Sequence, residues 1–361
     1  MKQPLSGISV TLMSVAVSII LASCFNFNNF TTWVAWAFMS MIPAQILIGV
    51  TWHGNPHFAE NLRQPAKGVA LLFTTLALGA IAASIAFFIV GDGVAPPAFT
   101  LISYAVLTLV VMLWFALMFG GWPFVRPAEN SFKRGLLMLF TCYVISYALL
   151  YIFFDFSFLR GAPGYATGFF PHGLFNANSA IVFVVTFSSA LSLFLHFNLW
   201  PLTIISPLRR QPWLGLAWTI LSLAFGYAGM YFGVSILGLS PLSFLAWVAV
   251  PFVLGSIIVL NAMEDSLFSK MRQPLKGICN TLAAIALAYG LAAAYSTAAH
   301  QIVIRSSENS PPNSTYALWM ATAMLVTLLP LLVLIDFFAL WPFSRKARSL
   351  DLPTVPDNGI G

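Results

Sequence analysis

Long hydrophobic runs alternate with short polar segments along the whole chain. Each run is close to the roughly 20 residues that an α-helix needs to cross a bilayer. The runs lack the alternation of a transmembrane β-barrel, and isolated strands would leave backbone polar groups unpaired in lipid. The pattern therefore predicts ten membrane-spanning helices, at residues 8–24, 32–51, 69–90, 98–119, 136–154, 175–199, 214–236, 242–262, 277–299 and 316–341.

The composition supports the same class of protein. Of the 361 residues, 60% are hydrophobic and 7% are charged, whereas about 25% of a soluble domain is charged. So few charges exclude a soluble enzyme, a disordered chain and a coiled coil. The three cysteines include no Cys-x-x-Cys pair, and we interpret them as packing residues. We predict an all-α polytopic membrane protein that forms one integral-membrane domain over residues 1–361.

The basic residues are concentrated on one side of the predicted membrane domain. Fourteen of the sixteen Lys and Arg residues lie at the termini or in connections after even-numbered runs, and only Arg160 and Arg305 lie on the opposite side. Cytoplasmic loops carry such an excess. We therefore predict a multi-pass protein of the cell inner membrane with both termini in the cytoplasm and a short disordered tail at 346–361. The net charge of +6 then belongs to these loops and does not indicate nucleic-acid binding.

Two short motifs recur at the predicted cytoplasmic ends. Gln-Pro-x-x-Gly opens odd-numbered runs at Gln3–Gly7, Gln64–Gly68, Gln211–Gly215 and Gln273–Gly277, with a degenerate copy at Ser131–Gly135. Trp motifs close even-numbered runs at Trp52-His53-Gly54, Trp122-Pro123-Phe124, Trp200-Pro201-Leu202 and Trp341-Pro342-Phe343, and Met263-Glu264-Asp265 replaces the motif in the fourth unit. Pro suits a helix start, and Trp suits the membrane interface. The motifs predict five helical hairpins, at approximately 1–60, 61–128, 129–208, 209–268 and 269–345.

The spacing of the Gln-Pro motif suggests a higher level of repetition. Gln64 follows Gln3 by 61 residues, and Gln273 follows Gln211 by 62. The first two hairpins would then correspond to the last two, with the third between them. Since each hairpin contains two spans, the copies have the same orientation. We predict a 4+2+4 parallel internal repeat about an axis along the membrane normal.

Three polar residues within the runs are candidates for transport. A carboxylate inside a span is costly and usually faces the bundle interior, so Asp336 is a candidate proton or cation site; alternatively, it pairs with Arg345 or Lys346 near the interface. His196 lies at a similar depth, and it either shares a vestibule with Asp336 or is a hydrogen-bonded packing residue. Gln45 is the third polar side chain at membrane depth.

The loop at 154–175 on the opposite side is rich in aromatic residues and glycine and carries few charges. Asp155, Arg160 and His172 are therefore candidates for a polar constellation over the outer mouth. The alternative is that the loop anchors at the interface through its aromatic residues and contains only a local Asp155–Arg160 pair.

Signals for metal or cofactor chemistry are weak. His53 and His57 have the spacing of a helical metal pair, but Gly54 and Pro56 interrupt a helix there. They remain weak candidates for a loop metal site, and we predict no metal and no cofactor. Neither a P-loop nor a Gly-x-Ser-x-Gly elbow is present.

These features favour a transporter or permease of a small solute, coupled to protons or another cation. One alternative is a non-catalytic membrane subunit that anchors or assembles a larger complex through its Arg-Gln-Pro turns. A second is a membrane enzyme acting on a lipid or quinone, which the scarcity of clustered acids and histidines disfavours. The expected partners are the bilayer, a small solute, and a membrane-protein partner or a second copy, but not nucleic acid.

Overall fold

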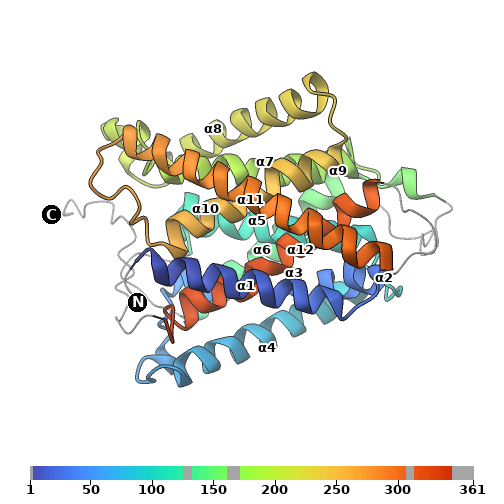
Figure 1. The fold of residues 1–361 in the computed structure, drawn as a ribbon, viewed down its shortest axis with the longest axis horizontal. Helices are drawn as coiled ribbons and strands as arrows, with labels where there is room; N and C mark the ends of the chain where they lie inside the picture. The colour runs from blue at the N-terminus through green and yellow to red at the C-terminus, as the bar shows by residue number, and fades with distance from the viewer. Residues whose placement is uncertain (1–2, 125–131, 161–170, 306–312, 344–361) are drawn as a thin grey trace.

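The computed structural model describes residues 3–124, 132–160, 171–305 and 313–343. It is 77% helical, and within the described residues ten helices are long and apolar enough to cross a membrane. These helices run roughly along the long axis of the molecule (Figure 1). The chain is thus an all-α polytopic protein, as the hydropathy pattern predicts. The predicted tail at 346–361 lies outside the described residues.

Five spans occupy odd-numbered positions along the chain, and apart from a π-helical end in the seventh span each is one α-helix. They are α1 (Leu5–Ser23), α4 (Ala66–Ile89), α6 (Phe132–Phe153), α8 (Trp213–Met230) continued by the π-helix η8 (Tyr231–Ile236), and α11 (Leu275–Arg305).

The five even-numbered spans are more irregular, because π-helical turns interrupt or end four of them. The second span starts earlier than predicted because Asn26 caps its first turn by accepting a hydrogen bond from the amide of Asn29. The elements are α2 (Phe27–Asn29), η1 (Phe30–Val34), α3 (Ala35–Ile46) and η2 (Leu47–Thr51); α5 (Phe99–Leu113) and η4 (Trp114–Met118); α7 (Ala177–His196); α9 (Pro241–Phe244), η9 (Leu245–Ala249), α10 (Val250–Ile257) and η10 (Ile258–Ala262); and α12 (Asn313–Leu332) and η11 (Val333–Phe337).

Short elements lie in the connections between spans. Two two-residue strands pair in parallel beside the outer loop, and four 3-10 turns occur elsewhere in the described connections. These elements are β1 (Phe154–Asp155), β2 (Phe175–Asn176), η3 (His57–Ala59), η5 (Ser157–Leu159), η6 (Leu202–Ile204) and η7 (Ser206–Arg209).

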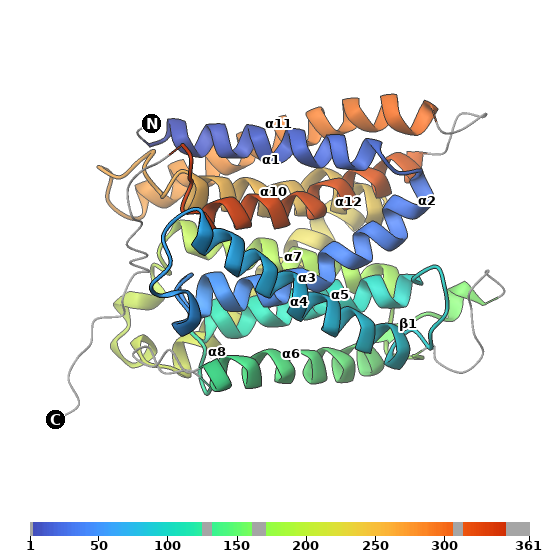
Figure 2. The same cartoon turned by 90° about the horizontal axis from the view of Figure 1, so that it is seen from below.

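The ten spans form two shells. Even-numbered spans are 67–78% buried within the protein, whereas odd-numbered spans are only 17–39% buried. Among the even-numbered spans, α3 packs against α5, α5 against α7, α7 against α10, α10 against α12, and α12 against α3. These contacts close a ring of five inner spans. Helices such as α4 and α8 lie at the edges of the bundle in Figure 1, and α6 lies at the edge in Figure 2.

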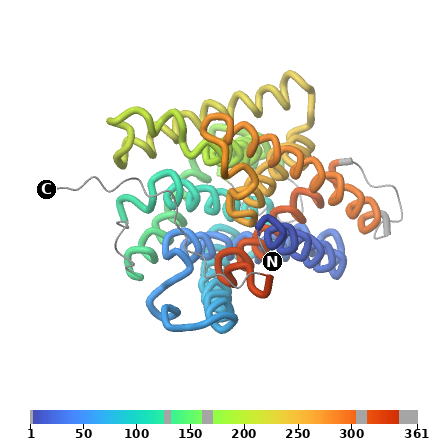
Figure 3. Tube along the Cα trace, turned by 60° about the vertical axis from the view of Figure 1, so that its left-hand side comes forward, coloured from blue at the N-terminus to red at the C-terminus, as the bar shows by residue number. Residues whose placement is uncertain are grey.

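Each outer helix covers a groove between two inner spans. Helix α4 packs on α3 and η11, α6 on α5 and η2, α8 on α7 and η4, and α11 on α10, α12 and α7. Helix α1 packs on α12 and η10, so the start of the chain lies beside its last span (Figure 3). We call the face where outer helices begin and inner spans end the Gln-Pro face.

The inner spans end at the Gln-Pro face in a recurring backbone structure. Two consecutive residues there have positive φ, which side chains other than Gly rarely adopt. In four spans the amide of the second residue donates to a carbonyl six residues earlier, one residue further than in a Schellman cap. In the sixth span, Leu199 donates to Phe194, five residues earlier. The positive-φ pairs at this face are His53–Gly54, Gly120–Gly121, Asn198–Leu199, Glu264–Asp265 and Ala339–Leu340.

This backbone structure corrects the alignment of the Trp motifs. Trp122 follows its positive-φ pair, as Trp200 and Trp341 follow theirs, but Trp52 precedes its own pair. The counterpart of Trp52 in the fourth span is therefore Phe119. Burial agrees, since Trp52 is 1% exposed and Trp122 is 44% exposed. Trp122 has the position of an interfacial side chain, whereas Trp52 is part of the core.

Candidate functional site

The glutamine of the Gln-Pro-x-x-Gly motif joins an outer helix to an inner span. Gln211 donates from Nε2 to the carbonyl of Met118 at 2.9 Å, and its Oε1 accepts from the amide of Gly215 at 3.2 Å. The acceptor is the last residue of η4, whose carbonyl has no partner within its own helix. The same Nε2 bridge joins Gln3 to Ala262, Gln64 to Phe337 and Gln273 to His196, each the last residue of an inner span.

The glycine of the motif allows this close approach. A Cβ on Gly215 would lie 2.7 Å from the Phe119 ring, and one on Gly68 would lie 2.6 Å from the Phe338 ring. In the degenerate copy, a Cβ on Gly135 would lie 2.5 Å from Nε1 of Trp52. At contacts this short, any larger residue would require the facing ring or the helices to move. The four complete copies of the motif thus join an outer helix to an inner span through both their glutamine and their glycine.

Gln45 and Asp336 lie at one interface, between α3 and α12. Gln45 is fully buried and donates to the carbonyl of Leu329 at 3.1 Å, while its Oε1 has no partner. One turn further along the same span, a Cβ on Gly49 would lie 2.7 Å from Oδ2 of Asp336. The half-buried Asp336 carboxylate therefore sits against the backbone of the second span. Arg345 and Lys346, its alternative partners, lie outside the described residues.

Each of the two helices at this interface contains an internal proline. Pro43 lies inside α3 and Pro330 lies inside α12, and each removes a backbone hydrogen bond. Both spans also end in π-helical turns, which are rare and often occur at functional sites. The polar pair Gln45 and Asp336 thus lies between two inner spans that each contain a proline and a π-helical turn, features that the eighth span shares.

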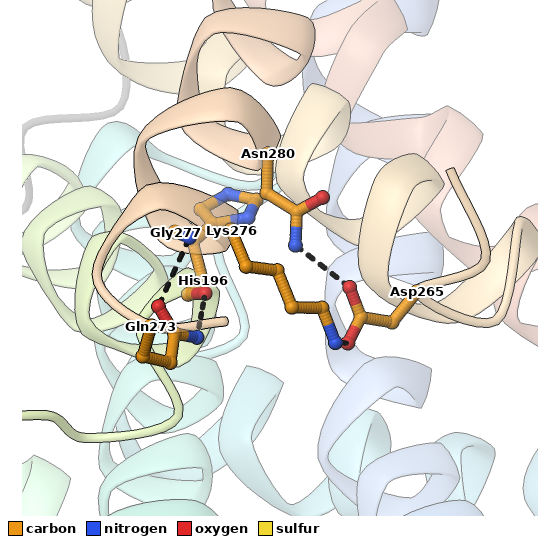
Figure 4. Close-up of polar contacts among 6 residues, drawn as sticks. All are labelled: His196, Asp265, Gln273, Lys276, Gly277 and Asn280. Atoms are coloured by element: carbon orange, nitrogen blue, oxygen red, sulfur yellow. Dashed lines mark hydrogen bonds and ion pairs between the residues drawn. The ribbon is translucent and has the colours of Figure 1, made fainter. Parts of the chain in front are cut away.

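His196 lies at a different interface, between α7 and α10. Its Nε2 is 3.0 Å from Oγ of Ser256, its Nδ1 has no partner, and the residue is 1% exposed. Its carbonyl accepts the bridge from Gln273 (Figure 4). His196 and Asp336 therefore belong to separate junctions of the inner ring.

Beside His196 lies a charged group that the sequence did not single out. The Asp265 carboxylate pairs with the Lys276 ammonium through Oδ2 and accepts from Nδ2 of the fully buried Asn280 at 2.7 Å through Oδ1 (Figure 4). Oδ1 of Asn280 has no partner. One feature of the sequence points to this charged group. Met263-Glu264-Asp265 replaces the Trp motif in the fourth hairpin, which indicates that this hairpin differs from the others.

At the opposite face, the structure brings together two of the three outer-loop candidates. Nδ1 of His172 is 3.3 Å from Oδ1 of Asp155. The hydroxyl and amide of Ser157 also donate to Asp155, and these hydrogen bonds lower the pKa of its carboxyl group. Arg160 is exposed and does not pair with Asp155. Most of the loop between them lies outside the described residues.

The two weak metal candidates have different environments. His53 adopts a positive φ at the end of the second span, and burial lowers the pKa of its imidazole. His57 is exposed and contacts Glu60 at 3.0 Å. In the described part of the chain, no group of three or more His, Cys, Asp or Glu side chains is arranged to hold a metal.

Comparisons with known proteins do not add a function. No protein-family model matches the chain, and neither a curated protein nor a solved structure matches it.

Proposed function

We propose that this chain is an inner-membrane transporter of a small solute, coupled to a proton or another cation, with its solute site between α3 and α12. The observation that carries the proposal is that Gln45 contacts the tenth span at Leu329 and that Gly49, one helical turn further along the second span, faces Asp336. Both Gln45 and Asp336 carry oxygen acceptors at this contact between two inner spans.

The energetic cost of this arrangement favours a binding role. A buried polar atom without a partner destabilises a fold by about 1–3 kcal/mol, and Oε1 of Gln45 is such an atom. A solute that donates hydrogen bonds would satisfy this oxygen. The Asp336 carboxylate would attract a cationic group or take up a proton, and polar side chains at this depth commonly mark substrate and ion pathways.

The helix geometry agrees with this role. Transporters often bind solutes near interrupted helices, because the breaks free backbone groups to face a cavity. The spans containing Pro43 and Pro330 remain helical throughout, but each proline leaves one carbonyl of the preceding turn without its usual backbone donor, and the two spans pack directly on each other. By contrast, the outer helices α1, α4, α6 and α11 contain no proline.

The same proposal covers the organisation and the orientation of the chain. We interpret the ring as five hairpins, each contributing one outer and one inner span, with the predicted 4+2+4 correspondence as a second level of similarity. Because fourteen of the sixteen basic residues belong to the Gln-Pro face or its flanking termini, this face would be cytoplasmic.

Substituting the carboxylate tests the proposal. In proteoliposomes on a solid-supported membrane, concentration jumps of a panel of small amines, amino acids, sugars and organic acids should produce transient currents with the wild-type protein. Asp336→Asn should abolish the current that the wild type shows, because the amide removes the negative charge while keeping the shape.

The matched control is Asp92→Asn. Asp92 is exposed at the opposite face and has a positive φ that Asn also tolerates, so its currents should equal those of the wild type. Wild-type currents from Asp336→Asn would remove Asp336 from the mechanism. A wild-type protein that responds to no solute in the panel would count against transport itself.

A further inference from the structure

The position seven residues after the motif glutamine, or after Ser131 in the degenerate copy, is fully buried in every outer helix, and in α11 it is an amide. Because it packs against the inner spans, an apolar side chain is expected there. Asn280 occupies the position in α11, at 0% exposure, and its four counterparts are 0–1% exposed. Those counterparts are Val10, Leu71, Met138 and Trp218.

Two further residues differ in type from their counterparts in the other hairpins, and both lie where α11 meets the ends of α7 and η10. The inner span that receives the α11 bridge ends in His196, an ionisable residue, where the other inner spans end in Thr51, Met118, Ala262 and Phe337. The second positive-φ residue is Asp265 in the adjacent span, where the others have Gly54, Gly121, Leu199 and Leu340. Figure 4 shows the side chains of Asp265 and Asn280 pointing toward one another.

Packing alone does not require these polar residues. The lysine three residues after the motif glutamine occurs in two outer helices, and in α4 it is Lys67, which donates to Oδ1 of Asn55 at 2.8 Å. In α11 it is Lys276, which pairs with the Asp265 carboxylate. The Lys67–Asn55 contact shows that a neutral partner suffices to join helix and loop. When one copy of a repeated arrangement carries polar residues that its packing does not need, a functional site is the usual reason.

We propose that the junction formed by Asp265, Lys276, Asn280 and His196 binds a monovalent alkali-metal cation. Oδ1 of Asn280 is a fully buried acceptor without a partner, on the same amide that donates to Asp265. Carboxylate and amide oxygens are the ligands that hard cations prefer. Helices α7 and η10 both end here, and their C-terminal dipoles add negative potential.

In this site the Lys276 ammonium group competes with the bound cation for the Asp265 carboxylate. With no cation bound, its ammonium neutralises Asp265; when a cation binds, the long side chain moves toward the water at the Gln-Pro face. The Lys276 and Asp265 side chains are 15% and 28% exposed, so the junction is open to that face. The other charged groups of this region are Glu264, Lys270 and Arg272, all in the segment between η10 and α11.

This inference rests on the proposed function, because it assigns the coupling cation of the transporter to a second junction. The experiment is thermal unfolding of the purified protein in detergent, followed by tryptophan fluorescence. NaCl or KCl is titrated against choline chloride at constant ionic strength. The wild-type unfolding temperature should rise saturably with at least one of the two alkali cations, because a ligand that binds only the folded state stabilises it.

Three variants make the result specific. Asp265→Asn should abolish the rise, and Asn280→Leu, which introduces the residue found at the same position in α4, should abolish or weaken it. Lys276→Gln should move the midpoint of the titration to a lower cation concentration, because the competing ammonium group is removed. Lys67→Gln is the matched control and should leave the titration unchanged.

The absence of any alkali-specific rise in the wild type would overturn the proposal, and so would an unchanged rise in Asp265→Asn. A midpoint for Lys276→Gln equal to that of the wild type would also contradict it. Because no solute is present, a failure here leaves the Asp336 transport test intact, and a failure of that test leaves this one intact.

Discussion

Trp52 and Trp122 stand at the ends of two inner spans in similar local sequence, yet one is a core residue and the other is partly exposed. The difference arises from their placement on either side of a positive-φ backbone pair. Trp52 packs against Gly135 and stacks on Phe132 with ring centroids 5.1 Å apart. In this position it takes the place that Phe119 and its equivalents hold in the other inner spans.

The burial of the two tryptophans predicts different costs of truncation. Trp52→Ala should lower the free energy of unfolding by about 3–5 kcal/mol, because it leaves a cavity under α6. Trp122→Ala, at 44% exposure, should cost much less. Reversible unfolding in mixed micelles measures both values, and equal losses would contradict the corrected alignment.

At the scale of elements, the glutamine bridge joins four of the five outer helices, α1, α4, α8 and α11, to the end of an inner span. The bridge satisfies one carbonyl at the end of one helix and one amide at the start of another, so a single side chain caps two termini. It thereby fixes the position of an outer helix whose remaining contacts are mostly apolar and non-directional.

Removing one bridge tests its contribution. Gln211→Leu keeps the side-chain volume similar but leaves the Met118 carbonyl and the Gly215 amide without this partner, and it should lower the free energy of unfolding by about 1–3 kcal/mol. Gln301→Leu, on the exposed side of α11, should be nearly neutral. The same micelle unfolding assay compares them, and a Gln211→Leu protein as stable as the control would refute a structural role for the bridge.

The sequence predicted the spans well and their junctions poorly. Length and apolarity are enough to identify a membrane helix, so the ten predicted runs correspond to the ten observed spans. The role of Gln211 was not predictable, because its acceptor lies 93 residues away. Asp265 was missed although its partners lie only 11 and 15 residues away, because its ion pair and its contact with Asn280 arise only when the segment after η10 folds back onto α11.

Among the candidate transport residues, the sequence indicated which side chains are polar at membrane depth but not which of them meet. Gln45 and Asp336 are far apart along the chain, and only the packing of the second span on the tenth places them at one interface. His196 has a similar depth but faces Ser256 in another junction. The sequence indicates how deep a side chain lies along its helix, whereas the neighbouring span that this side chain faces depends on tertiary contacts.

At the scale of the whole molecule, the protein is a closed ring of five inner spans inside five outer helices. The ring closes where the second span packs on the tenth, which is also the proposed solute site. The closing contact of the ring and the proposed solute site therefore share one interface, and its geometry can be measured without knowledge of the solute.

The most direct test is disulfide cross-linking across that interface in native membranes. In a variant with Cys24, Cys142 and Cys279 replaced by Ala, Gly49→Cys and Asp336→Cys should form a disulfide on mild oxidation. A Cβ on Gly49 would lie 3.1 Å from Cβ of Asp336, and a small separation of the helices brings the pair to the roughly 3.5–4.5 Å of a disulfide. Gly49→Cys with Leu195→Cys on α7, two positions away in the ring, should not cross-link. Mass spectrometry of linked peptides would show the first pair and not the second. Absence of the first link, or equal yields for both pairs, would contradict the closed inner ring and the site placed within it.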